Sequence, residues 1–282
     1  MSRTLYSRVN YIDSEYIEMH KLIDKKEIGI DEIIKKYKRF INGLEAARDW
    51  SNKKENADGV DPILVLLIAR NYGEIAYYDA RNGKVDDSVA HNIKAILEYS
   101  RFYRMCRREK RNDFIGAYNP LYWIASTYRN MGDVQYRAGK LTYRLGSFVT
   151  ADSFFTKHSE HFNDIKNSNY SEYDYNKRLE EYSRYYSAMS SHNVFIIVSA
   201  DATANGNKLP KELKYYLNDA FINYKNLYES PIYLSKDEQK YIDLAIDQII
   251  NACLQYLDDN PEEEGGDIML NREEYIKPKK KR

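Results

Sequence analysis

Two histidines and an aspartate form a candidate metal site. His158, His161 and Asp164 recur at every third position, which places them close to one face of a helix. Imidazole and carboxylate groups on such a face can hold zinc or iron, and a metal-dependent helical enzyme would be built around them. No second pair of ligands accompanies them in the sequence. The pattern therefore favours an ordinary polar surface, and we predict no metal and no other cofactor.

Other catalytic patterns do not fit the sequence. The zinc-protease pattern H-E-x-x-H does not occur. The stretch from Gly132 to Lys140 differs from a phosphate-binding loop, because six residues separate its two glycines and Leu141 stands where Ser or Thr is required. None of the five histidines follows an arginine by about one helical turn, as in some small helical nucleases. We therefore predict that the protein is not an enzyme.

Four arginines recur at spacings of three and four along one predicted helix, with Phe102 and Tyr103 between them. Arginine makes bidentate bonds to phosphate or carboxylate, so the stripe could contact nucleic acid or an acidic partner. The alternative is a solvated helix end, where cations interact favourably with the helix dipole. The arginine stripe consists of Arg101, Arg104, Arg108 and Arg111.

The last 25 residues, 258–282, are acidic first and basic afterwards. Glu262 to Glu264 precede a terminal run that resembles a nuclear-import signal in a eukaryotic host. The run could instead contact nucleic acid or an acidic neighbouring subunit, or only keep the protein soluble. A segment of this composition buries little apolar surface, which predicts a flexible, extended arm. Its basic end includes Lys279, Lys280, Lys281 and Arg282.

A repeated motif lies at the centre of the chain. Arg70–Tyr77 returns as Arg129–Tyr136, so that Gly132 follows Gly73 by 59 positions (132 − 73 = 59). Each copy follows a capping residue and a proline and precedes a Gly-Lys pair, and such residues begin and end helices. The repeat therefore predicts two helical hairpins. These signals are Asp61-Pro62 and Gly83-Lys84 in the first copy, and Asn119-Pro120 and Gly139-Lys140 in the second.

The two hairpins resemble tetratricopeptide repeats over about residues 61–160. That family has a small residue within its first helix and an aromatic residue one turn later. Gly73 and Gly132 match the first feature, and Tyr77 and Tyr136 match the second. The resemblance implies that the glycines let helices approach closely while the tyrosines fill the remaining groove. It also implies stacked hairpins with a protein-binding surface, although the spacing of 59 exceeds the family's period of about 34.

Helical periodicity extends over most of the chain. The run Ile63–Ala69 is apolar on every side, which predicts a central, buried helix, and Ser235–Glu238 has the form of a capping box. We predict an all-α fold of about nine helices, arranged as stacked antiparallel hairpins in a solenoid or bundle. The expected regions are N-terminal helices over 1–60 that pack on the repeat, two tandem hairpins over 61–165, C-terminal helices over 166–257, and the tail over 258–282.

The overall composition limits the partners. The 43 basic and 43 acidic residues cancel, so no global field favours nucleic acid or an anionic membrane. Cys106 and Cys253 suggest neither a disulfide framework nor a metal knuckle, and their use fits a reducing compartment. Met1–Tyr6 lacks the apolar region of a secretory signal, and the longest apolar runs are shorter than the 18 or so residues that span a bilayer. We predict a soluble cytoplasmic protein without a membrane partner.

These observations favour a protein–protein interaction or assembly protein. Its helical body would act as a scaffold or adaptor, and its arm would bind a partner or a neighbouring subunit of an oligomer. One specific version is a structural component of a large complex, such as a viral head–tail connector, which would place the protein within a virion. The alternative is a nucleic-acid-associated factor that uses the arginine stripe and the basic terminus, and that would be nuclear in a eukaryotic host. The third is the metal-dependent enzyme at His158 and His161.

Overall fold

A computed structural model gives the fold of the chain, which divides into two compact units, Met1–Lys140 and Leu141–Arg282. Every regular element within the described residues is a helix, and no strand occurs among them. This confirms the predicted all-α fold. The structure describes residues 17–23, 25, 28–53, 61–111, 114–115, 118–138, 146–155, 157, 173–229, 231–266 and 271–276.

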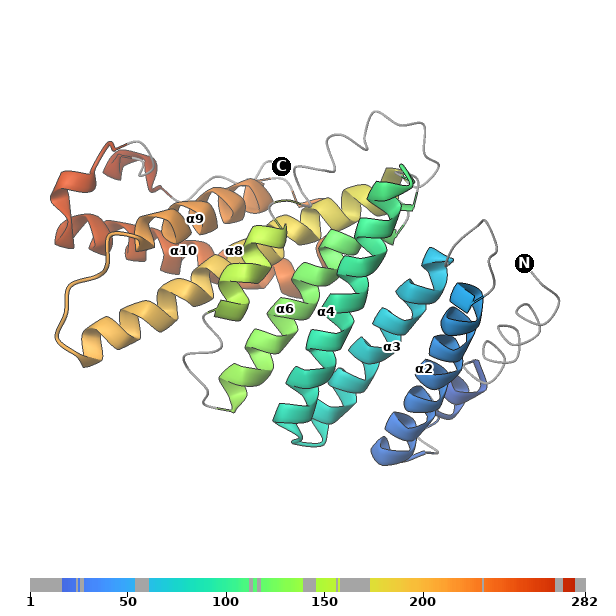
Figure 1. Ribbon diagram of the computed structural model, residues 1–282. Helices are drawn as coiled ribbons and strands as arrows, with labels where there is room; N and C mark the ends of the chain where they lie inside the picture. The colour runs from blue at the N-terminus through green and yellow to red at the C-terminus, as the bar shows by residue number, and fades with distance from the viewer. Residues whose placement is uncertain are drawn as a thin grey trace. The chain divides into compact units, whose positions relative to one another are not determined.

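The first unit is a row of helices in which each main helix packs on the next (Figure 1). α3 contacts both α2 and α4, so its two sides are covered, and its apolar run is buried from Leu64 to Leu66 and again at Ile68 and Ala69. The predicted central position of this run is thus confirmed. The helices are α2 (Ile30–Lys53), α3 (Pro62–Arg81), α4 (Val85–Arg108) and α6 (Pro120–Arg137), preceded by a short helix over 17–23.

Local signals set the ends of α3 as the sequence predicts. The Asp61 side chain accepts a hydrogen bond from the Ile63 amide at 2.9 Å, and Pro62 is the first helical residue. At the other end, Gly83 has φ +74°. This left-handed conformation costs little for glycine and lets the chain reverse into α4.

Buried polar contacts join α3 to α4. The Ser88 hydroxyl donates to the Ala76 carbonyl at 2.7 Å, and the Asp79 carboxylate lies 2.8 Å from His91 Nδ1. The His91 ring also stacks on Tyr72, with 6.1 Å between ring centroids. Because buried polar groups are costly without partners, these pairs fix how the two helices meet.

Gly73 and Tyr77 do not have the packing role that we expected. A Cβ atom added to Gly73 would meet no atom of the described residues within 4 Å, and Tyr77 is 54% exposed. Gly73 therefore does not bring two helices close together, and Tyr77 does not fill a space between them. Gly132 is buried on α6, whereas the side chain of Tyr136 lies outside what the structure describes.

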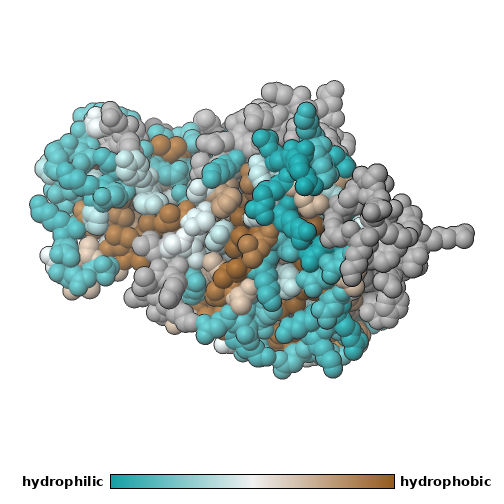
Figure 2. All heavy atoms as spheres, viewed as in Figure 1, coloured by the Kyte–Doolittle hydropathy of each residue, from teal (hydrophilic) through white to brown (hydrophobic). Residues whose placement is uncertain are grey.

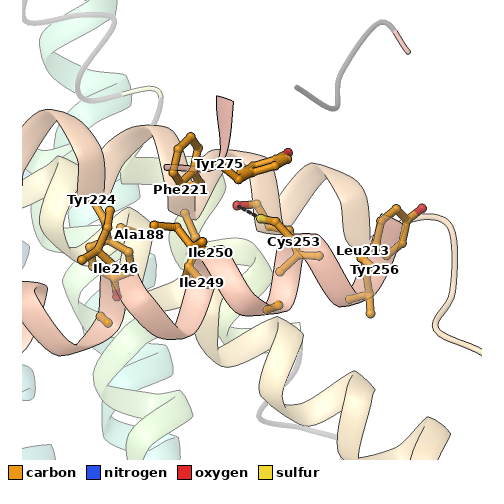
Figure 3. Packing of buried hydrophobic residues seen from close by; sticks show 14 of the residues in the cluster. Ala188, Leu213, Phe221, Tyr224, Ile246, Ile249, Ile250, Cys253, Tyr256 and Tyr275 are labelled. Carbon is orange, nitrogen blue, oxygen red and sulfur yellow. Dashed lines mark hydrogen bonds between the residues drawn. The ribbon is translucent and has the colours of Figure 1, made fainter. Parts of the chain in front are cut away.

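The second unit has its core between α8, α9 and α10, with α9 packed on both of the others. Figure 3 shows Phe221 of α9 facing Tyr275, with Cys253 of α10 beside them. Val194 to Ala200, the second apolar run of the sequence, is helical within α8. The unit contains a helical segment over 146–155, α8 (Tyr173–Ala204), α9 (Leu213–Glu229), α10 (Lys236–Asp259), and the 3-10 turns η1 (Pro261–Glu263) and η2 (Arg272–Glu274).

Local signals also set helix ends in this unit, and the predicted capping box is confirmed. α8 ends at Ala204 and is followed by Gly206 with φ +66°. The Ser235 side chain accepts from the Glu238 amide at 3.3 Å, and the Glu238 carboxylate accepts from the Ser235 amide at 2.7 Å. This reciprocal pair is the capping box that begins α10.

Part of the predicted C-terminal arm makes contacts that the sequence did not indicate. The Glu263 carboxylate lies 2.6 Å from Lys214 Nζ. Arg272 pairs with Asp258 at 2.6 Å, and Tyr275 is buried, with its ring 4.8 Å from that of Phe221. The end of the arm, including Lys279, Lys280, Lys281 and Arg282, lies outside the described residues.

On the face drawn in Figure 2, most described residues are hydrophilic, and smaller groups of hydrophobic residues lie among them. Ile93 and Leu97, one turn apart on α4, are among the exposed hydrophobic side chains. Cys106 and Cys253 are buried and form no disulfide. Among the described helices, none combines the length and the apolar character that crossing a membrane requires.

Candidate functional site

A groove of about 470 Å³ lies between α3, α4 and α6 of the first unit. The α4 side contributes Ser88 and Asn92. The other two helices contribute the residues that determine its depth and charge. From α3 these are Gly73, Ala76, Tyr77, Ala80 and Arg81, and from α6 they are Arg129, Asn130, Asp133, Val134 and Arg137.

Small residues make the groove deep along α3. Gly73, Ala76 and Ala80 are separated by three and four positions, so they lie on one face of the helix. None of them extends beyond a Cβ atom, and the space above Gly73 is open. The sequence therefore leaves a hollow where larger side chains would have closed the surface.

Positive charge dominates the lining of the groove. Arg81 and Arg137 are both exposed, and Arg129 adds a third guanidinium group, against the single carboxylate of Asp133. Burial raises the pKa of Asp133, while Arg129 and Arg137 act in the opposite direction. Because three guanidinium groups face one carboxylate among the lining residues, the groove is suited to an anionic group.

Arg81 and Tyr77 form a small platform on the α3 wall. The Arg81 guanidinium donates to the Tyr77 hydroxyl at 3.3 Å and lies 5.6 Å from the centroid of the same ring. The two contacts hold both side chains at the mouth of the groove, where Tyr77 remains 54% exposed. An incoming chain would meet an aromatic face and a cation together.

Both copies of the repeated motif line this groove. Gly73 and Tyr77 come from the first copy, and Arg129 and Asp133 come from the second. The repeat thus builds a hollow surface, where we expected it to build a close helix contact. Sequence reasoning did not select Arg81, Arg129 and Arg137 as site residues. A signal was present for two of them, since Arg129, Asp133 and Arg137 recur every fourth position, which places them on one helix face.

The four arginines of the stripe do not share one helix. α4 ends at Arg108, so Arg111 lies beyond it, with its guanidinium 3.7 Å from the centroid of the Phe114 ring. Arg101 lies 4.0 Å from Glu98, and Arg108 lies 3.4 Å from Glu109. These contacts are local, and Arg104 is exposed.

The candidate metal ligands His158, His161 and Asp164, for which we predicted no metal, lie outside the described residues. Within the described part of the chain, no group of three or more His, Cys, Asp or Glu side chains is placed to hold a metal ion. The partner-binding residues predicted in the tail, Lys279 to Arg282, also lie outside it.

Comparisons with known proteins do not identify the chain. No protein-family model matches the sequence, no curated protein matches it, and no solved structure matches the fold. The resemblance to tetratricopeptide repeats therefore remains a prediction. The groove and its residues are the basis for assigning a function.

Proposed function

We propose that this protein is a non-enzymatic interaction protein whose groove between α3, α4 and α6 binds an acidic segment of a partner protein. The observation that carries the proposal is a hollow with small residues on its α3 wall and exposed arginines on its α3 and α6 walls. An adaptor or scaffold needs such a recognition surface and no catalytic groups.

The size of the groove fits a few side chains of a peptide. Ligand pockets in proteins typically enclose about 300–1,000 Å³, and the groove of about 470 Å³ lies within this range. Its α3 wall has room above Gly73, where an added Cβ atom would meet no atom of the described residues within 4 Å, so a partner side chain has space to enter there. The hollow is therefore available in the unbound protein.

The charges of the groove select the chemistry of the partner. Guanidinium groups form bidentate hydrogen bonds with carboxylates, and Arg81 and Arg137 present two of them from different helices. Tyr77 adds an exposed aromatic ring beside Arg81. A segment that contains Asp or Glu next to an apolar residue satisfies both features.

The partner can be a separate protein or another subunit of a larger assembly. The assembly version includes a structural component such as a viral head–tail connector, in which neighbouring subunits bind one another's segments. We place the protein in the cytoplasm, since Cys106 and Cys253 are both buried without a disulfide, as in a reducing compartment.

The nucleic-acid function has less support than the groove. Two of the four stripe residues, Arg101 and Arg108, lie beside the carboxylates of Glu98 and Glu109, which reduces the charge that they present to phosphate. Arg104 is exposed and provides the test of that alternative. Binding to DNA or RNA that falls steeply with salt and is lost in Arg104→Glu would favour it.

Selection from a displayed library of random peptides tests the proposal. The full chain is compared with the double variant Arg81→Glu/Arg137→Glu, and Arg104→Glu is the matched control with the same type of charge change outside the groove. We expect peptides rich in Asp and Glu to be enriched on the wild type and on the control. Enrichment of the same peptides on the groove variant would contradict the proposal.

A further inference from the structure

Two carboxyl groups of the second unit converge on one serine hydroxyl. Ser187 of α8 lies 2.5 Å from Asp152 Oδ1 and 3.3 Å from Asp219 Oδ2. Asp152 belongs to the helical segment over 146–155, and Asp219 belongs to α9. Three helical segments therefore meet at this cluster.

Among the described residues, the side chains that donate hydrogen bonds to the two carboxyl groups are Ser187, Ser191 and Asn223. A serine hydroxyl carries a single proton, so Ser187 can donate to only one of the two carboxylates at a time. Asp219 has two further donors, the Ser191 hydroxyl at 3.1 Å and the Asn223 amide at 3.0 Å. Ser187 is buried, and two carboxylates at one desolvated site cannot both ionise easily.

We propose that Asp152 and Asp219 share one proton, and that loss of this proton loosens the packing of the 146–155 helix on α8 and α9. The shared proton turns one carboxyl into a donor and removes the repulsion between two negative charges. The device belongs to the second unit and does not depend on what the groove binds.

The surroundings of the cluster support a shared proton. Burial is the largest cause that raises the pKa of Asp152 to about 7, and the Asp219 charge adds to it. Burial raises the pKa of Asp219 as well, while bonds from Ser191, Ser187 and Asn223 oppose the rise. Although both residues reach the surface in part, their carboxyl groups are desolvated.

Among the described residues, no cation is found to act on the pair. The groups that act on the two carboxyls are each other and the donors Ser187, Ser191 and Asn223. Tyr216 of α9 also faces Asp152, whose charge adds to the burial that raises the Tyr216 pKa. A phenol of this kind is uncharged near neutral pH, so it does not neutralise either carboxylate.

The 146–155 helix is the element that the proton would hold in place. Ser147, Phe148, Ala151 and Phe155 are buried, and the Phe155 ring lies 5.7 Å from Tyr186 of α8. Asp152 supplies a polar contact within this apolar surface. When both carboxylates are ionised, the repulsion acts directly between this helix and α9.

The sign of the pH dependence follows from the raised pKa. In the unfolded chain Asp152 loses its proton near its ordinary value of 3.8, whereas in the folded protein it does so at about 7. Between these values the folded state holds the extra proton, so stability falls as pH rises through this window. Above about pH 7 the full loss of stability has occurred. The 146–155 helix should then exchange its amide protons faster than it does at lower pH, after allowance for the intrinsic rate.

Infrared spectroscopy and amide hydrogen exchange on the full chain test the proposal. We expect the wild type at about pH 6 to show the carbonyl band of a protonated carboxyl, and this band to fade as pH rises through the neutral range. Asp152→Asn should lack the band and should keep the 146–155 helix protected at about pH 8, where the wild type loses protection. The control, Asp201→Asn, replaces an exposed aspartate of α8 and should behave as the wild type does.

Three results would overturn the shared proton. One is a wild type without the protonated carboxyl band at about pH 6, a measurement that needs no variant. Another is an exchange rate that depends on pH in either Asp152→Asn or Asp219→Asn as it does in the wild type. Either variant alone gives this result, so the test remains usable if the other fails to fold. The third is protection of the helix by added Mg²⁺ or Ca²⁺ in the wild type but not in Asp152→Asn, which would show a cation between the carboxylates.

Discussion

Glu181 of α8 holds Leu234, which lies just before α10, through a hydrogen bond of 3.0 Å from the Leu234 amide to Glu181 Oε1. The same oxygen accepts from the amides of Ile232 and Tyr233 at 3.0 and 2.9 Å. Three consecutive backbone donors of a loop are thus satisfied by one carboxylate on another helix. This contact fixes the entry to α10 against α8.

Removal of this carboxylate should destabilise the protein more than removal of its neighbour. Glu181→Ala leaves three loop amides without their acceptor, and hydrogen bonds to charged groups contribute about 1.5–3 kcal/mol each, so we expect a loss of about 2–3 kcal/mol after solvent replaces part of the bonding. Glu180→Ala, which removes a partly exposed pair with Arg184, should cost about 0–1 kcal/mol. Urea unfolding measures both, and equal losses would contradict the role of Glu181.

Gly73→Ala should stabilise the first unit. Alanine is favoured over glycine within a helix by about 0.5–1 kcal/mol, and within the described part of the chain the new Cβ meets no atom closer than 4 Å. Gly83→Ala is the opposite control, because φ is +74° there and a left-handed conformation costs a side chain about 1–2 kcal/mol. Thermal unfolding distinguishes the two. Destabilisation by Gly73→Ala would show that the glycine serves close helix packing after all.

Acid should weaken the contact between the C-terminal segment and α9. The hydrogen bond from Lys214 is the largest cause that lowers the pKa of Glu263 below its ordinary value of 4.5. The stabilisation is therefore complete above about 4.5 and is lost as pH falls through the lower, folded-state pKa. Glu263→Gln should lower the melting temperature at neutral pH and have little effect in strong acid. A difference in melting temperature between Glu263→Gln and the wild type that grows as pH falls would contradict this prediction. Glu212→Gln, which changes an exposed glutamate, is the control.

The sequence predicts what local chemistry determines. Asp61, Gly83 and Ser235 mark helix ends because a cap or a left-handed residue acts within one turn. The groove could not be predicted from local signals. The repeated glycine motif has the same sequence whether the helix face that carries the glycine packs on another helix or borders open space. Only the arrangement of α3, α4 and α6 decides between the two.

Contacts between distant parts of the chain were also beyond the sequence. Asp152 and Asp219 belong to different helices, and no local pattern indicates that they share Ser187. The acidic run that contains Glu263 has the composition of an extended arm, yet its partner Lys214 lies on α9. Such pairs depend on tertiary packing, which the periodicity of each helix does not specify.

The most direct test of the groove is the affinity of one selected acidic peptide for three forms of the full chain. Calorimetry would compare the wild type, Arg81→Glu/Arg137→Glu and Arg104→Glu. If the groove binds the peptide, the double variant loses two charge-assisted contacts worth about 1.5–3 kcal/mol each, so its affinity should fall at least tenfold, while Arg104→Glu binds as the wild type does. Equal affinity for all three, or a loss confined to Arg104→Glu, would contradict the assignment of the groove as the binding site.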